Sequence, residues 1–147
     1  MGVMGTFNQP APVGAITAIG VSTGGVTQGT SIDPGASTNT KGSWTQLIAS
    51  TAQRYTSLIV AIGQQENNAR VGIYTWTVDI AIGASGSEQI LIPDLPLACD
   101  TNGDQLFPCT FPTIPIDIPS GTRISARAQC SGNDATDRLL DLALYVW

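Results

Sequence analysis

The segment Ile114–Cys130, IPIDIPSGTRISARAQC, carries the clearest signature of the fold class. Its first five residues alternate isoleucine with proline or aspartate, the period of a strand with one apolar face. Residues 119–122 then predict a turn, because Pro119 presets φ and Gly121 supplies a left-handed position. After the turn the alternation resumes, so the segment predicts two strands of an antiparallel sheet. The residues expected to face inward there are Ile124, Ala126, Ala128 and Cys130, and those expected to face outward are Arg123, Ser125, Arg127 and Gln129.

The same period of two extends on both sides of this segment. A strand is expected to begin at residues 44–48, and the apolar run at 55–62 (YTSLIVAI) is typical of a strand buried on both faces. Residues 71–82 predict the longest strand, with one apolar face and one solvated face. The closing stretch 139–147 places Leu140, Leu142, Leu144 and Val146 on one face. Strands therefore account for most of the chain after residue 43.

Prolines are expected to limit the sheets at two places. Residues 88–92 predict a strand, and Pro93 and Pro96 are expected to stop the chain from pairing further. Residues 98–113 form a long excursion with two prolines of its own. Residues 114–118, which contain another proline, are expected to form an edge strand.

The composition agrees with this pattern. The chain has 147 residues, enough for one domain, with 16 Gly, 9 Pro and only 12% charged residues. No stretch shows the spacing of a helix. We therefore predict an all-β protein, an antiparallel β-sandwich of the jelly-roll type at residues 43–147, preceded by an extended N-terminal arm at residues 1–42.

The arm is rich in Gly and Thr and contains only two charged residues, Asp33 and Lys41. Two alternatives remain open for it. It docks on a neighbouring subunit or on a particle surface, or it folds onto its own sandwich as an extra strand. Apolar residues in the arm and at the closing strand are the candidate subunit or capsid contacts: Val13, Ile16, Ile19, Tyr145, Val146 and Trp147.

Charge and residue usage exclude several classes of function. The net charge is −5, and the six cations are too scattered to follow a nucleic-acid backbone, so we expect no nucleic-acid partner. Histidine is absent, which excludes Ser-His-Asp and Cys-His catalysis and the commonest zinc ligand. No apolar run is long enough to span a membrane, and the N-terminus lacks the pattern of a secretory signal. We predict a non-enzymatic protein with no cofactor, no metal and no membrane partner, made in a cytoplasm.

A few groups leave weaker alternatives. Asp79 and Glu88 are the best candidates for a pair of catalytic carboxylates, although a solvated strand face explains Asp79 equally well. Asp100–Asp104 resembles the start of a calcium loop but fits a plain Asx turn better. Cys99 and Cys109 flank one loop and could pair, whereas an odd number of cysteines favours reduced thiols. The aromatic residues could form a sugar-stacking platform, against the simpler interpretation that they belong to the core and to interfaces; they are Trp44, Trp76, Trp147, Tyr55, Tyr74 and Tyr145.

Four pieces of the chain resemble a known family. They are NTKGSWTQLIAS (39–50), DIAIGASGSEQILIPDL (79–95), IPSGTRISARAQ (118–129) and LLDLALYVW (139–147). In these strand entries and turns, the last hundred residues or so resemble small β-proteins among the virion structural proteins of tailed bacteriophages. The resemblance implies a jelly-roll protein displayed on the phage particle, commonly as a trimer. It implies no site residue.

The expectation for function follows from both lines of argument. We expect a capsid decoration (cement) protein on the capsid exterior, a homo-oligomer and most simply a trimer, whose partner is the major capsid protein. Binding only to the assembled lattice stabilises the shell by mass action. The alternative is a tail-associated receptor- or glycan-binding module.

Overall fold

The structure is a computed structural model of the whole chain. It describes residues 15–21, 29–64, 75–99, 106–107, 113–131 and 140–147. All regular secondary structure in these ranges is β. Within them, no helix is long and apolar enough to cross a membrane.

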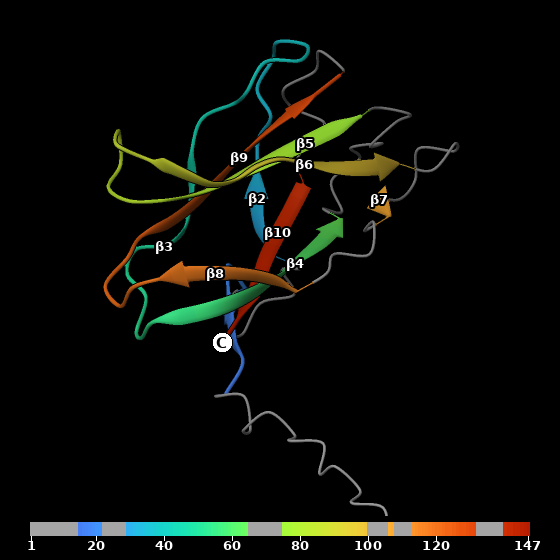
Figure 1. The fold of residues 1–147 in the computed structure, drawn as a ribbon. Helices are drawn as coiled ribbons and strands as arrows, with labels where there is room; N and C mark the ends of the chain where they lie inside the picture. Colours follow the sequence, from blue (N-terminus) through green and yellow to red (C-terminus); the bar gives the residue numbers. More distant parts are fainter. Residues whose placement is uncertain (1–14, 22–28, 65–74, 100–105, 108–112, 132–139) are drawn as a thin grey trace, which may run out of the picture.

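The first sheet is built around the C-terminal strand. Its members are β1 (Thr17–Ile19), β2 (Thr30–Ile32), β4 (Tyr55–Gln64), β8 (Ile114–Ile118) and β10 (Leu140–Val146). The order is β1-β10-β4-β8, and β2 also pairs with β10. In Figure 1, β10, in red, runs past β2 and ends beside the blue β1, with β4 and β8 forming the lower edge of the layer. Every pair in this sheet is antiparallel.

The second sheet lies across the sandwich from the first. Its members are β3 (Thr45–Ile48), β5 (Trp76–Ile82), β6 (Gln89–Cys99), β7 (Leu106–Phe107) and β9 (Ile124–Cys130). The order is β3-β9-β5-β6-β7, and all pairs are again antiparallel. Figure 1 shows β5, β6 and β9 as the upper layer.

The route of the chain through these sheets is that of a jelly roll. With the short strands β1 and β7 set aside, the chain crosses to the other sheet at every connection except the β5–β6 hairpin. The first sheet then has the order β2-β10-β4-β8, and the second has β3-β9-β5-β6. Strands adjacent in a sheet are thus mostly distant in sequence, as in two interleaved Greek keys. The predicted fold class is confirmed.

The core fills the space between the two sheets. The closing strand contributes Leu140, Leu142, Leu144 and Val146, all fully buried, as the sequence predicts. The opposite sheet contributes Trp76, Val78, Ile80, Ile124, Ala126, Ala128 and Cys130. Each large side chain buried in this way stabilises the fold by about 1.5–3 kcal/mol. The inward row predicted for the segment after the Pro119 turn is confirmed, and Gly121 has the expected positive φ of 79°.

Trp147 is tied into the first sheet through its backbone. Its N–H donates to the Ser57 carbonyl oxygen at 3.2 Å, and its own carbonyl oxygen accepts from the N–H groups of Thr56 and Ser57 at 2.8 and 3.2 Å. These bonds continue the β10–β4 ladder past the last residue of β10. The closing stretch is therefore a structural member of the sandwich to its end.

Part of the segment predicted as an arm belongs to the sandwich. β1 and β2 lie along the same edge of β10, and Ile19 and Ile32 are buried in the core. For these residues the structure follows the second alternative, an extra strand on the chain's own sheet. Residues 1–14, including the candidate contact Val13, lie outside the described residues.

The structure corrects three details of the predicted strands. Pro93 and Pro96 do not end the pairing, since β6 continues to Cys99 with Pro96 opposite Thr77. The ladder accommodates them through register shifts, and Asp94 between them takes a positive φ of 46°. The run at 55–62 is buried on one face only, with Ile59 and Ala61 half-buried on the other. The face of β5 expected to be solvated is covered instead at Asp79 and Ala81.

Candidate functional site

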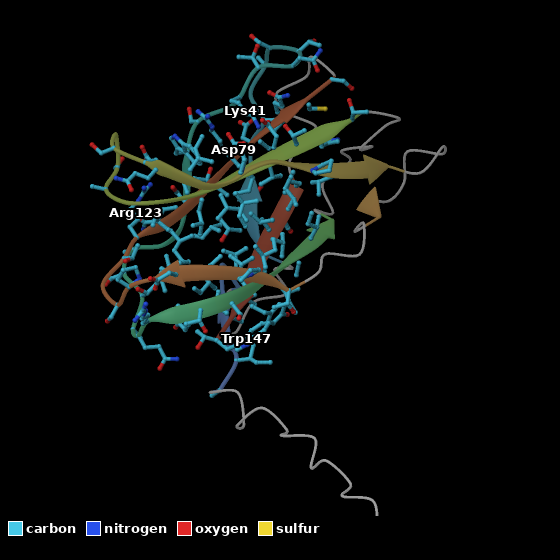
Figure 2. All side chains as sticks on the ribbon, viewed as in Figure 1. Lys41, Asp79, Arg123 and Trp147 are labelled. Carbon is cyan, nitrogen blue, oxygen red and sulfur yellow. The ribbon has the colours of Figure 1, made fainter. Side chains whose placement is uncertain are left out.

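The outer face of the second sheet carries a group of paired charges. Lys41, just before β3, lies against Asp79 on β5 and Asp94 on β6, and Arg127 on β9 joins them. We call these four residues the charged cluster. Figure 2 shows Lys41 and Asp79 close together on the upper layer, far from Trp147 on the other sheet.

Lys41 is the chain's only lysine, and its ammonium group is fully occupied. Nζ donates to Asp79 Oδ1 at 2.8 Å, to Asp94 Oδ1 at 2.6 Å and to Thr77 Oγ1 at 3.0 Å. An ammonium group has three hydrogens, and here each has an oxygen acceptor. Lys41 therefore links the segment before β3 to β5 and β6 of the second sheet.

Asp79 is the centre of the cluster, with its side chain only 3% exposed. Its Oδ1 accepts from the Asp94 N–H at 2.8 Å, and its Oδ2 accepts from Arg127 Nε at 2.9 Å. Burial alone would raise the pKa of the Asp79 carboxyl, but the Asp94 N–H and the Lys41 and Arg127 cations together hold that pKa below its ordinary value. Arg127 also lies over the ring of Trp44, 4.4 Å from the ring centroid. Asp79 thus remains ionised and neutralised by its partners.

A second ion pair lies nearer the β5–β6 turn. Arg123 Nη1 donates to Glu88 Oε1 at 3.0 Å and to the Gly83 carbonyl oxygen at 3.3 Å, while its Nε donates to Gln46 Oε1 at 3.1 Å. Desolvation opposes ionisation of Glu88, but the N–H groups of Glu88 and Gly86 and the Arg123 guanidinium lower its pKa overall. Arg123 thus links the β5–β6 turn to the start of β9 and to β3.

Asp79 and Glu88 do not form a catalytic pair. Gln89 lies opposite Ile82, so Glu88 lies near Gly83, four residues along β5 from Asp79. At about 3.4 Å per residue, the two backbone positions are roughly 14 Å apart along the sheet, whereas glycoside hydrolysis uses carboxylates roughly 5–9.5 Å apart. Each carboxylate is instead bound to its own cations.

The backbone before β3 holds Lys41 in place. The N–H of Asn39 donates to the Cys130 carbonyl oxygen at 2.8 Å, and that of Gly42 donates to the Ala128 carbonyl oxygen at 2.8 Å. A Cβ on Gly42 would collide with the carbonyl oxygen of Asp33, so only glycine permits this close approach. No local pattern predicts these contacts of Lys41, because its partners lie 36 to 53 positions away in the sequence.

The outer face of the first sheet is different, because apolar side chains are exposed there. Tyr145 is 40% exposed on β10, with Ala18 of β1 and Ile59 of β4 directly opposite it. Ile16, one step before β1, is 63% exposed, and Trp147 is half-buried. We call these five residues the apolar patch.

Not every candidate contact residue lies on this surface. Ile19 and Val146 are buried in the core, because they alternate with the outward residues of β1 and β10. Of the candidate contacts within the described residues, Ile16, Tyr145 and Trp147 are at the surface. Alternation along each strand was the signal that could have separated the two groups.

Asp141 is the one acidic residue of β10, and it is 6% exposed on the outer side of the sheet. Ser31 of β2 and Gly63 of β4 are its register partners. Burial raises the pKa of its carboxyl above the ordinary value. Ionisation of Asp141 therefore works against folding.

The alternative of a sugar-stacking platform is not supported by the aromatic residues that the structure describes. Trp76 and Tyr55 are buried in the core, and Trp44 lies beneath Arg127 on the second sheet. Tyr145 and Trp147 lie on the first sheet. Tyr74 is outside the described residues.

The described residues also offer little for cofactor or metal binding. They include no group of three or more His, Cys, Asp or Glu side chains that could hold a metal ion. An open depression of about 560 Å³ lies between the β5–β6 and β8–β9 turns, lined by small residues and by Arg123. The candidate cation loop Asp100–Asp104 and the Cys99–Cys109 pairing fall outside the side chains described.

Ion pairs link the strands and turns of the second sheet, and the first sheet carries the exposed Arg54–Asp117 pair beside the apolar patch. Comparisons with protein-family models, with curated proteins and with solved structures found no match.

Proposed function

We propose that the protein is a non-enzymatic structural component of a phage particle, a decoration protein that binds the assembled capsid and stabilises it. The jelly-roll strand order is the observation that carries the proposal. This architecture is shared by many viral coat proteins, and also by lectins and cupins. Because one fold serves several functions, the surface must decide among them.

The surface favours assembly. The described ion pairs are formed between residues of the chain itself, so they rigidify the subunit and neutralise Asp79, Asp94 and Glu88. The apolar patch offers area that gains stability when covered, at about 25 cal/mol per Å². In this proposal the subunit is a homo-oligomer, most simply a trimer, located on the capsid exterior with the major capsid protein as its partner.

The stabilising mechanism requires no chemistry. A ligand that binds only the assembled lattice shifts the equilibrium toward assembly by RT ln(1 + [L]/Kd) at each site. Many identical sites on one shell multiply this effect. The subunit therefore needs only a rigid scaffold and a matching surface.

Binding to the two states of the capsid protein tests the proposal. Purified protein is added to particles that lack it and, separately, to unassembled capsid protein, and the bound fraction is measured by sedimentation. We expect saturable binding to particles only, with a raised temperature of particle disruption. Equal binding to unassembled capsid protein, or no binding to particles, would contradict the proposal.

Residues 1–14 provide a sharper variant for the docking arm. Deleting them leaves β1 and β2 in place, whereas a longer deletion would remove the buried Ile19 and Ile32 and confuse docking with folding. We expect the shortened chain to melt at the same temperature and to occupy fewer sites on the particle. Unchanged occupancy would assign docking to the folded domain alone.

A further inference from the structure

We propose that two copies of this chain meet through the outer face of the first sheet, with Tyr145 at the centre of the contact. This inference rests on the homo-oligomer of the proposed function and replaces its trimer with a two-fold pair, because a face that meets the same face of a second copy closes a dimer. The register supplies the geometry. Ala18, Tyr145 and Ile59 lie opposite one another on β1, β10 and β4, so they form one row across three strands.

Exposure shows that this row is accessible. Tyr145 and Ile16 are among the four large hydrophobic residues that are exposed in the described part of the chain. Tyr145 is paired with Ala18 of β1, and Ile16 lies one residue before β1. A third member of the four, Val21, follows β1 two residues after its end. The fourth, Ile90, lies on β6 in the other sheet, so it serves as a matched control.

Charge favours a second copy over a charged partner as the occupant. The chain has a net charge of −5, so copies approaching each other through charged surface repel. In the described part of the first sheet, the charged side chains outside the patch are either paired with each other or buried. Arg54 and Asp117 form an exposed pair with each other at 2.7 Å, and Asp141 is almost wholly buried.

An uncharged surface requires an uncharged partner. If a partner placed ionised groups against Tyr145 and Ile59, those groups would lose their water of hydration and would find no counter-ion on the patch. A second copy of the same face brings tyrosine, isoleucine and alanine instead. The acidic chain can therefore meet itself on this face at the smallest electrostatic cost.

The size of the face sets what else must join the contact. Strands about 4.8 Å apart and roughly 24 Å long give four neighbouring strands a face on the order of 500 Å². A stable interface buries about 800 Å² on each partner. The patch is thus the centre of the contact, and the polar rim around it completes the area.

Two substitutions of equal chemistry on opposite sheets test the inference. Tyr145→Glu places a carboxylate in the centre of the face, and Ile90→Glu places one at a site of similar exposure, 48% against 40%, on β6. The mass in solution is measured by light scattering and sedimentation velocity over a range of concentrations. We expect the wild type and Ile90→Glu at a multiple of 15.3 kDa and Tyr145→Glu at 15.3 kDa.

A second variant guards against a folding artefact. Ala18→Arg carries the opposite charge on the neighbouring strand, and thermal melting confirms that each variant is folded. If Ala18→Arg also gives the monomer mass with a cooperative melt, the face is assigned. A wild type of 15.3 kDa throughout, or folded variants that keep its larger mass, would overturn the inference.

Failure of this inference is distinguishable from failure of the proposed function. A monomer in solution that still saturates particles leaves decoration standing and removes only the self-contact. An oligomer that dissociates on Tyr145→Glu but does not bind particles confirms the contact and removes decoration.

Discussion

Lys41 Nζ lies 2.8 Å from Asp79 Oδ1 although 38 residues separate the two in the sequence. This contact fastens the segment before β3 across the outer face of the second sheet. Alternation in the sequence predicts that this face of β5 is solvated, but the contact covers it at Asp79. Several consequences for stability depend on it.

Asp79→Asn is expected to destabilise the protein by about 3 kcal/mol, because it removes the buried carboxylate that Lys41 and Arg127 share and leaves Lys41 with only the exposed Asp94. At roughly 2–4 °C per kcal/mol, thermal melting at pH 7 should show a fall of about 6–12 °C. Asp117→Asn is the control, because that carboxylate is exposed in its pair with Arg54. Equal melting temperatures for the two variants would show that the cluster does not fasten the fold.

The Asp79 carboxylate also determines how the free energy of unfolding falls at acid pH. The pKa of Asp79 is lower in the folded state than its unfolded value of about 3.9, so its contribution is full above that value. The contribution is lost as the pH falls through the folded pKa. Denaturant titrations from pH 7 down to pH 2 should therefore show a steeper loss for the wild type than for Asp79→Asn. Parallel profiles would contradict this assignment.

Asp141→Asn is expected to act in the opposite direction. Burial raises the pKa of Asp141, so the folded state favours the protonated form, and stability falls as the pH rises from the unfolded pKa through the folded one. The neutral amide should raise the melting temperature by a few degrees at pH 7, and the gain should disappear near pH 3. A gain independent of pH would show that ionisation is not its cause.

Gly42→Ala tests the close approach beneath Lys41. An added methyl group meets the Asp33 carbonyl oxygen and lies 2.8 Å from the Pro34 carbonyl carbon, so the backbone must shift. We expect a loss of about 2–3 kcal/mol, measured by urea unfolding. Ser43→Ala, at the exposed neighbouring position, should change stability little. An equal effect of the two substitutions would contradict the crowding seen at Gly42.

The strands of the core could be predicted from the sequence because alternation is local. The four inward residues of β10 and the inward row of β9 from Ile124 to Cys130 follow directly from a period of two. The β8–β9 turn follows from proline and glycine chemistry at positions 119 and 121. These features depend on neighbours in the sequence and on little else.

The remaining features depend on tertiary contacts. The continuation of β6 past Pro93 requires register shifts against β5, and the burial of Asp79 requires cations from β9 and from the segment before β3. The one local sign of the charged cluster and of the Arg123–Glu88 pair is that Arg123 and Arg127 lie four residues apart, on one face of the same strand segment.

The number of copies in a purified phage particle distinguishes the proposed decoration protein from a tail-associated module. Quantitative mass spectrometry, with the major capsid protein as the internal standard, gives this number without any variant. We expect hundreds of copies per particle, in a fixed ratio to the capsid lattice. A few copies to a few dozen, as for a tail-associated receptor- or glycan-binding module, would contradict it.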